Sequence, residues 1–253
     1  MKSHILFLMK ADTIAKATRT VSVKESFENM QTGVPVLMYH YVYTANDVPA
    51  DLNSNWILDT ALDEQLKFLT DNGYYFPSFQ EVRAFVEGKH TLPAKSVVLT
   101  FDDAMPQFLT YDIPVLKKYK VPATSFFICS DGDALQKVVN FRNRYIMYDS
   151  HSFDLHRGGG SVGHGGRISA LSEAEIEADL KTSADMLQVH NAFAYPFGDV
   201  TEDGKLAVAA AGYQCGFTTK NDWCYVGDDV RALNRVRIQG NVSLSSYAAL
   251  VSE

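Results

Sequence analysis

Two adjacent aspartates at the end of an apolar run are the first residues in this sequence whose types could do chemistry. The run SVVLTF at 96–101 is typical of a buried strand, and Asp102 and Asp103 follow it directly. Neighbouring carboxylates raise each other's pKa, so the pair is easier to hold when one binds a cation and the other acts as a base. The alternative interpretation is a helix N-cap followed by a surface acid.

Two histidines form the second candidate group, within the segment 149–156. His151 and His156 are five residues apart, which places them about 140° apart on an ideal helix and on opposite faces of a strand. They can therefore converge only across a turn or loop. Together with an aspartate at a strand end they would form a set of two histidines and one carboxylate, which suits a catalytic divalent metal such as zinc. Taken alone, the pair more often marks a polar loop.

Two further strand ends carry polar or turn-forming residues. The run VLMY at 36–39 leads into His40, and the run AFA at 192–194 leads into Tyr195, Pro196, Phe197 and Gly198. A histidine at the end of a strand can serve in proton transfer. The simpler alternatives are a core histidine and an ordinary strand exit.

The elements that must position these residues alternate between strands and helices. We predict strands at 34–39, 96–101, 124–129 and 192–195, and helices at about 60–72, at 113–119 and from Ser172 onward. Gly73 is expected to cap the first helix, and Ser172 with Glu175 forms a capping box. This alternation predicts an α/β fold with a mostly parallel sheet, whose carboxyl ends gather the loops that carry chemistry. The glycine-rich stretch 158–166 lacks the features of a phosphate loop and is predicted to be a surface loop, with His164 solvated.

The composition excludes several classes of protein. The chain has 253 residues and a net charge of −7, so it lacks the basic excess that drives nucleic-acid binding. No apolar run approaches the roughly 18 to 20 residues that a membrane span needs. The three cysteines have neither metal-site spacing nor the density of a disulfide scaffold, and they leave the compartment open.

Taken together, these motifs resemble the polysaccharide deacetylases of carbohydrate esterase family four, the NodB homology domain. The resemblance implies an irregular (β/α)7-type barrel. Its Thr-Phe-Asp-Asp motif matches residues 100–103, which implies Asp102 as catalytic base and Asp103, with His151 and His156, as ligands of a divalent metal. Zinc is favoured, with cobalt, nickel or iron as alternatives. Its Pro-Tyr-Gly motif matches residues 196–198, where the backbone N–H of Phe197 would face the oxyanion.

The histidine spacing and the position of one motif are both similar to one branch of this family. The spacing is one residue longer than usual, and the form with Asp-Leu-His is similar to the branch that acts on poly-β-1,6-N-acetylglucosamine. The family's closing Leu-x-x-His motif has no match after Gly198, whereas residues 37–40 match it at the opposite end of the domain. This resembles the circularly permuted arrangement of that same branch and implies His40 as the general acid.

Other motif positions match less well. The arginine that orients the base is not found before Tyr195, and Arg235 or Arg237 would have to substitute from another strand, with exposed surface arginines as the alternative. Asp222 and Trp223 resemble the Asp-Trp element that supports the acid and lines the sugar groove. The predicted substrate-binding residues are Tyr195, Pro196, Phe197, Gly198, Asp222, Trp223 and Arg235.

The predicted organisation is a leader or stalk at 1–33 and one monomeric deacetylase domain at 34–253. The predicted function is metal-dependent removal of N-acetyl groups from an extracellular, biofilm or cell-envelope polysaccharide, with poly-β-1,6-N-acetylglucosamine favoured, although no convincing signal peptide is seen. Peptidoglycan, chitin oligomers and acetylated xylan are alternative substrates. An inactive carbohydrate-binding domain is an alternative of another class, and a non-haem iron oxygenase is disfavoured because its His-x-Asp pairing is missing.

Overall fold

A closed barrel of seven parallel strands forms the centre of the molecule. The computed structural model describes residues 30–104 and 106–253. The strands follow one another around the barrel in the order β11, β2, β5, β6, β7, β8 and β9. Their bounds are Leu233–Arg237, Val36–Tyr39, Val98–Phe101, Ala123–Phe127, Ile146–Ser150, Ala192–Ala194 and Cys215–Asn221. The predicted α/β barrel is confirmed, and every carboxyl end of these strands opens on one mouth.

The first barrel strand is apolar because it is covered on both sides. All four residues of β2 are buried, as are all four of β5, and the two strands pair in parallel from Val36 opposite Val98 to Tyr39 opposite Phe101. This register brings His40 and Asp102, the residues that follow the two strands, to the same level at the mouth.

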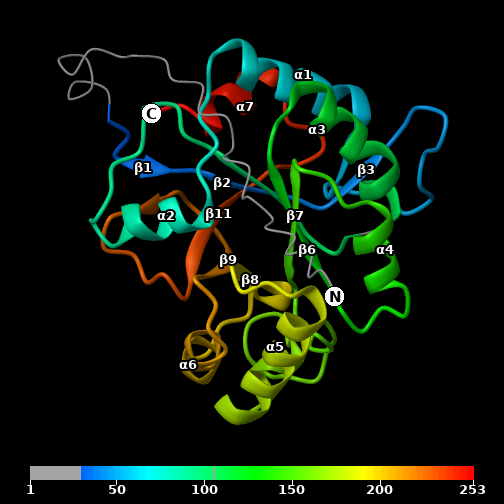
Figure 1. Cartoon of the computed structure of the whole chain (residues 1–253). Coiled ribbons are helices and arrows are strands. Elements are labelled where there is room, and N and C mark those ends of the chain that lie inside the picture. The colour runs from blue at the N-terminus through cyan, green and yellow to red at the C-terminus, as the bar shows by residue number, and fades with distance from the viewer. Residues whose placement is uncertain (1–29, 105) are drawn as a thin grey trace, which may run out of the picture.

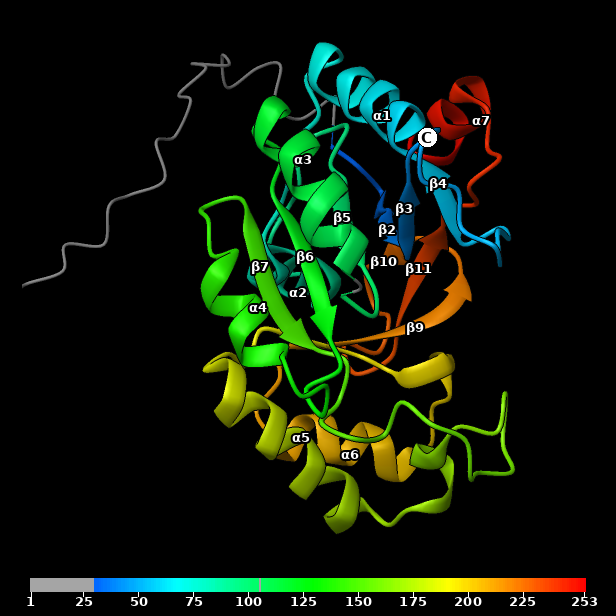
Figure 2. The same ribbon diagram turned by 90° about the vertical axis from the view of Figure 1, so that its right-hand side faces the viewer.

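Helices cover the outside of the barrel on two opposite sides. Figure 1 shows α1, α3 and α7 together on one side and α5 and α6 on the other, and the turned view in Figure 2 agrees. The helices are α1 Asp59–Asp71, α2 Phe79–Val86, α3 Ile113–Tyr119, α4 Ala134–Asn140, α5 Glu173–Leu187, α6 Glu202–Ala210 and α7 Leu244–Leu250. Short helical turns lie at η1 Phe108–Asp112, η2 Arg167–Ala170 and η3 Pro196–Gly198.

The three predicted helices are confirmed, along with their local signals. Gly73 follows α1 with φ of +70°, the left-handed conformation that glycine adopts without strain. At the start of α5, the Ser172 backbone N–H donates to a Glu175 carboxylate oxygen over 2.9 Å, completing the capping box. Such signals are read within four residues of the chain, which is why sequence alone located them.

The predictions of strands were incomplete, as were those of helices, since α2, α4, α6 and α7 were not predicted. The segment predicted at 34–39 is divided at Pro35 into β1 Gly33–Val34, which pairs antiparallel with β10 Cys224–Tyr225, and barrel strand β2. The strand β7 was missed because its sequence IMYDS ends in polar residues, and β9, CGFTTKN, because it mixes glycine and polar residues with few apolar ones. A small parallel pair, β3 Tyr41–Tyr43 and β4 Trp56–Leu58, adjoins the mouth after His40.

The domain extends a few residues beyond the predicted boundary at residue 34. The Gln31 side chain exchanges hydrogen bonds with the Ser96 backbone, and the Glu253 carboxylate accepts from the Thr32 and Gly33 backbone N–H groups. Residues 30–33 therefore belong to the folded unit. The rest of the predicted leader lies outside the described residues. Within the described part of the chain, no helix has both the length and the hydrophobicity that a bilayer crossing requires.

Candidate metal centre and catalytic site

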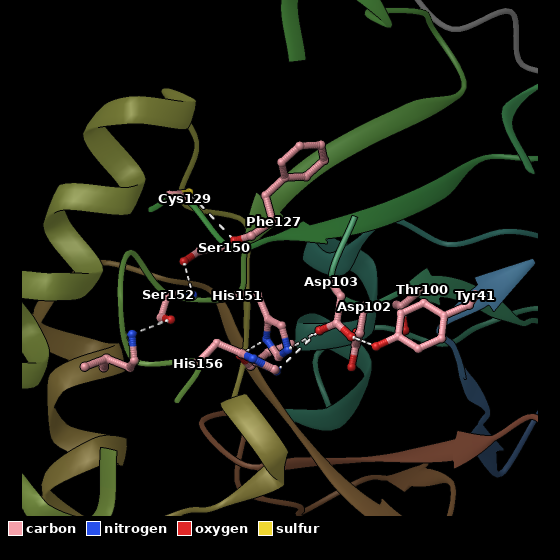
Figure 3. Close-up of polar contacts among 12 residues, drawn as sticks. Tyr41, Thr100, Asp102, Asp103, Phe127, Cys129, Ser150, His151, Ser152 and His156 are labelled. Atoms are coloured by element: carbon pink, nitrogen blue, oxygen red, sulfur yellow. Dashed lines mark hydrogen bonds and ion pairs between the residues drawn. The ribbon is translucent and has the colours of Figure 1, made fainter. Parts of the chain in front are cut away.

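Three of the predicted ligands converge at the barrel mouth. Asp103 Oδ1 lies 3.4 Å from His151 Nε2 and 3.3 Å from His156 Nε2, and the three ligand atoms all lie within 4.8 Å of one another. Figure 3 shows both imidazoles and the carboxylate pointing toward one another from the ends of two strands. Asp103 comes from the turn after β5 and His151 directly follows β7.

The donor set fits a divalent metal. Asp103 Oδ1 is buried and makes no hydrogen bond within the described residues, which is costly for a carboxylate oxygen unless a cation faces it. His151 Nδ1 lies 2.7 Å from the Ala194 carbonyl oxygen, and only a protonated Nδ1 can donate to a carbonyl. That assignment leaves the Nε2 lone pair free to bind a metal. Two imidazoles and one carboxylate are a catalytic donor set with open positions.

A tight turn brings the two histidines together, as the sequence analysis required. Ser152 has φ of +76°, and its hydroxyl accepts a hydrogen bond from the Leu155 backbone N–H. The Asp179 carboxylate on α5 accepts from the backbone N–H groups of Phe153 and Asp154, each over 2.8 Å. These contacts fix the turn from which His156 projects.

Asp102 is held by a buried arginine. Arg235 on β11 donates from Nη1 and Nη2 to the two oxygens of Asp102, each over 2.7 Å, and its side chain is fully buried. Its remaining donors bond the Thr218 carbonyl over 2.9 Å and the Thr100 hydroxyl over 3.2 Å. The interpretation of Arg235 as an exposed surface arginine is therefore wrong. The burial of Arg235 gives no support to its prediction as a substrate-binding residue, which stays a prediction.

The ion pair with Arg235 sets the charge on Asp102. Burial acts to raise the pKa of Asp102, but the Arg235 guanidinium outweighs it and holds that pKa below its ordinary value. The pKa of Asp103 is also lowered, because the neighbouring His151 and His156 imidazoles and the hydrogen bond from Tyr41 together outweigh the effect of burial. Both aspartates are therefore ionised at neutral pH.

The ligand histidines have opposite pKa shifts. Burial and the neighbouring His151 lower the pKa of His156. Burial also acts to lower the pKa of His151, but the carboxylates of Asp103 and Asp102 outweigh it and raise that pKa. His156 is thus held in the neutral form that binds a metal, and His151 is drawn electrostatically toward Asp103.

His40 lies at the same mouth, next in the chain to Tyr41. Its ring meets the Tyr41 ring edge-on, with centroids 5.8 Å apart. Burial lowers its pKa, while the charges of Asp102 and Asp103 act in the opposite direction. The structure therefore places a titratable imidazole within electrostatic reach of both aspartates.

The Pro-Phe-Gly turn lies beside His156. The Phe197 ring centroid is 4.5 Å from that of His156, and Phe197 has φ of +59°, an uncommon value for a residue other than glycine. Among the described residues, the backbone N–H of Phe197 has no acceptor. Backbone strain and an unused donor occur together at functional sites, and the predicted oxyanion contact remains compatible with this geometry.

The side chains of Tyr195 and Pro196, in the Tyr-Pro-Phe-Gly segment, are buried. Tyr195 is fully buried, stacks edge-on against Phe193 and donates its hydroxyl to the Arg231 carbonyl over 2.7 Å. Pro196 is buried as well. Their side chains belong to the packed interior and help to shape the turn, and their prediction as substrate-binding residues stays a prediction.

The predicted Asp-Trp element, Asp222 and Trp223, lies between β9 and β10. Trp223 donates its indole N–H to the Leu250 carbonyl over 3.0 Å, and the exposed Asp222 carboxylate accepts from the Trp223 backbone N–H. Both residues line a hollow of about 320 Å³ that Thr32 and Glu253 also border. After β9 the chain turns to pair β10 with β1. The predicted role of Asp222 and Trp223 beside His40 stays a prediction.

Sequence reasoning missed two residues that support the site. Asp199, next to the Pro-Phe-Gly turn, accepts from the backbone N–H groups of His164 and Gly166 over 2.8 and 2.7 Å, and so ties the glycine-rich loop to that turn. A Cβ on Gly163 would lie 2.0 Å from the Asp199 carboxylate, which explains a glycine there. The His164 side chain is 73% exposed, as predicted. Tyr41, the second missed residue, donates its hydroxyl to Asp103. Its position directly after His40 was the available signal.

Comparisons with known proteins agree with this geometry. The family model for polysaccharide deacetylases matches residues 89–216, which is 128 of the 253 residues. YxkH of Bacillus subtilis (strain 168), named as a polysaccharide deacetylase, is 26% identical over 222 residues, covering 86% of this chain and 76% of its own. A poly-β-1,6-N-acetyl-D-glucosamine N-deacetylase of Staphylococcus aureus (strain MSSA476) is 26% identical over 211 residues, covering 72% of this chain and 70% of its own.

A solved structure matches the whole barrel. The deacetylase PplD of Streptococcus pyogenes, in complex with acetate, superposes with a TM-score of 0.75 at 26% identity and covers 87% of this chain and 99% of its own. Together with the family match, and with the candidate metal ligands at the mouth of the same barrel, this likeness assigns the chain: it belongs to the polysaccharide deacetylase family.

Proposed function

We propose that this chain is a metal-dependent N-deacetylase of poly-β-1,6-N-acetylglucosamine, a polymer of the cell surface or biofilm matrix, and that it acts as a monomer. The observation that carries the proposal is the close placement of two carboxylates with different partners. Asp103 faces two histidines, and its Oδ1 makes no hydrogen bond within the described residues. Both oxygens of Asp102 accept hydrogen bonds from Arg235. One carboxylate is thereby suited to a cation and the other to a proton.

Asp103, His151 and His156 would hold the metal, with zinc favoured over cobalt, nickel or iron. A bound divalent metal polarises the acetyl carbonyl and lowers the pKa of a water molecule toward neutrality. The protein's own task at this point is to present three donors in a fixed geometry. The hydrogen bond from His151 to Ala194 fixes one imidazole, and the turn held by Asp179 fixes the position of His156.

Asp102 is the proposed general base. The Arg235 guanidinium keeps the carboxylate ionised and fixes the direction of both oxygens, so Asp102 is ready to accept a proton from the attacking water. The arginine also makes protonated Asp102 a stronger acid, which favours passing the proton onward rather than retaining it.

His40 and Phe197 are the proposed partners for the rest of the reaction. The backbone N–H of Phe197 would donate to the oxyanion, a contact worth roughly 3 to 4 kcal/mol where such donors have been removed. His40 would donate a proton to the departing sugar amine. The balanced outcome is cleavage of the amide C–N bond by water, giving acetate and a glucosamine residue in the polymer.

The choice of polymer rests on two observations. The two-histidine segment has the longer spacing of the poly-N-acetylglucosamine branch, and a relative over 72% of this chain carries that activity in its name. Peptidoglycan, chitin oligomers and acetylated xylan remain the competing substrates of the same chemistry.

Acetate release from a panel of polymers tests the proposal. Protein loaded with zinc is incubated with poly-β-1,6-N-acetylglucosamine, chitin oligomers, peptidoglycan and acetylated xylan, and free acetate is measured. We expect the largest kcat/KM on the first polymer. The Asp102→Asn variant should lose about 10²- to 10⁴-fold in kcat while retaining its metal, because Asp102 is not a ligand.

His90→Asn provides the matched control, since it changes an exposed histidine outside the ligand set. It should retain full activity. Preference for another polymer would overturn the substrate assignment alone. Full activity of Asp102→Asn would overturn the assignment of the base, and absence of acetate from every polymer would overturn the enzymatic function.

A further inference from the structure

Tyr41 makes a direct hydrogen bond to the carboxylate among the candidate ligands. Its phenol O–H donates to Asp103 Oδ2 over 2.5 Å, on the side opposite the two histidines (Figure 3). Oδ1, which faces His151 and His156, has no such partner within the described residues. The two oxygens of one carboxylate are therefore in different environments.

The Tyr41 side chain is itself held in place. It is half-buried, its ring centroid lies 4.8 Å from that of Trp56, and its backbone pairs with Trp56 in the parallel ladder of β3 and β4. The phenol therefore approaches Asp103 from a strand pair rather than from a free loop. A donor fixed in this way can determine the orientation of the group that it bonds.

The orientation matters because a carboxylate can bind a metal through one oxygen or through both. A bidentate carboxylate would occupy a position that a catalytic site leaves open for water or substrate. Asp103 lies in a turn with φ of +69°, so its backbone is already constrained and the remaining freedom is rotation of the carboxyl group. A hydrogen bond to Oδ2 removes that freedom.

We propose that Tyr41 is a positioning residue that limits Asp103 to binding the metal through Oδ1 alone and so preserves an open coordination position. This inference rests on the proposed function, because it presumes that Asp103, His151 and His156 bind a metal. It adds to that function a residue outside the ligand set, contributed by the strand pair β3 and β4.

Tyr41→Phe removes the donor while keeping the ring against Trp56, and Tyr43→Phe is the matched control. Tyr43 lies on the same strand, and its hydroxyl makes no hydrogen bond within the described residues. Zinc affinity is measured by competition with a chromophoric chelator, and coordination by visible absorption of cobalt-loaded protein. Melting temperature with and without metal shows whether each variant is folded.

We expect Tyr41→Phe to bind zinc about 10- to 100-fold more weakly, the usual effect of losing a partner of a metal ligand. We also expect weaker cobalt absorption bands, as the carboxylate becomes bidentate and the coordination number rises. Tyr43→Phe should match the wild type in both. A Tyr41→Phe protein with wild-type affinity and spectrum overturns the role of Tyr41 alone, whereas a wild-type protein that binds no metal overturns the proposed function as well.

Discussion

Two buried aspartates in different regions of this molecule have pKa shifts of opposite direction. Asp102, at the barrel mouth, receives two hydrogen bonds from Arg235, and its pKa is lowered despite burial. Asp112, in the turn η1 between barrel and helices, is as fully buried, yet both of its oxygens lack a partner within the described residues. Burial raises its pKa well above the ordinary value. Depth alone therefore does not determine the charge of a carboxyl group.

The surroundings of the two groups explain the difference. Burial is the only influence on the Asp112 carboxyl, since no cation within the described part of the chain acts on it. The nearby Tyr39, whose pKa the Asp112 charge acts to raise, bonds Gln65 over 2.8 Å and Tyr247 over 3.3 Å. At the barrel mouth, in contrast, the Arg235 guanidinium bonds Asp102, and two imidazoles lie next to Asp103. Burial alone therefore raises the pKa of a carboxyl group, and a neighbouring cation can reverse the direction of that shift.

The largest expected effect on stability and activity comes from removing the cation that bonds Asp102, so that Asp102, like Asp112, is buried without one. Arg235→Met leaves Asp102 buried without a cation, which should lower the free energy of unfolding by about 3 to 5 kcal/mol. Activity should fall with it, because a protonated Asp102 cannot act as a base. Denaturant unfolding at pH 7 and acetate release measure the two effects.

The double variant Arg235→Met with Asp102→Asn sharpens the same test. Without a buried charge, most of the lost stability should return while activity stays low. If the single and double variants were equally unstable, the packing of Arg235 rather than its charge would be responsible.

His40 provides the next largest effect. His40→Asn should reduce kcat by about 10²-fold or more, as expected for the loss of a general acid. Because burial lowers the pKa of His40, the protonated form becomes scarce as pH rises above that value, so wild-type activity should decline on the alkaline side. A pH profile of kcat checks this, and an unchanged alkaline limb in His40→Asn would exclude His40 as the acid.

Asp112→Asn is expected to give the smallest effect, and of opposite sign. A carboxyl whose pKa is raised on folding stabilises the protein fully below its unfolded pKa, near 3.9, and loses that contribution as pH rises through the folded pKa. The asparagine variant should therefore be more stable than the wild type at neutral pH, by roughly 1 to 3 kcal/mol, with the difference disappearing near pH 3. Thermal unfolding across pH measures it, and equal stability at all pH values would show that Asp112 has a partner when ionised.

Local signals predicted part of this architecture, and long-range contacts account for the rest. The apolar run before Asp102, the histidine pair and the capping box at Ser172 are all read within a few residues, and the structure confirms their placement. Arg235 carries no such signal, since its partner lies 133 positions earlier in the chain. The contact of Trp223 with Leu250 was equally invisible in the sequence, because a dipeptide does not show which way the chain turns after a strand.

The place of Arg235 on the last barrel strand has a consequence for how the site is built. Since β11 lies between β9 and β2, it closes the ring, and the guanidinium reaches Asp102 only when it does so. Because β11 is also the last barrel strand in the sequence, Asp102 can gain its arginine partner during synthesis only after every other barrel strand has been made. Contacts so distant in the chain form slowly. A chain whose ring is still open would contain the three candidate ligands and Asp102, but Asp102 would lack the arginine that orients both of its oxygens.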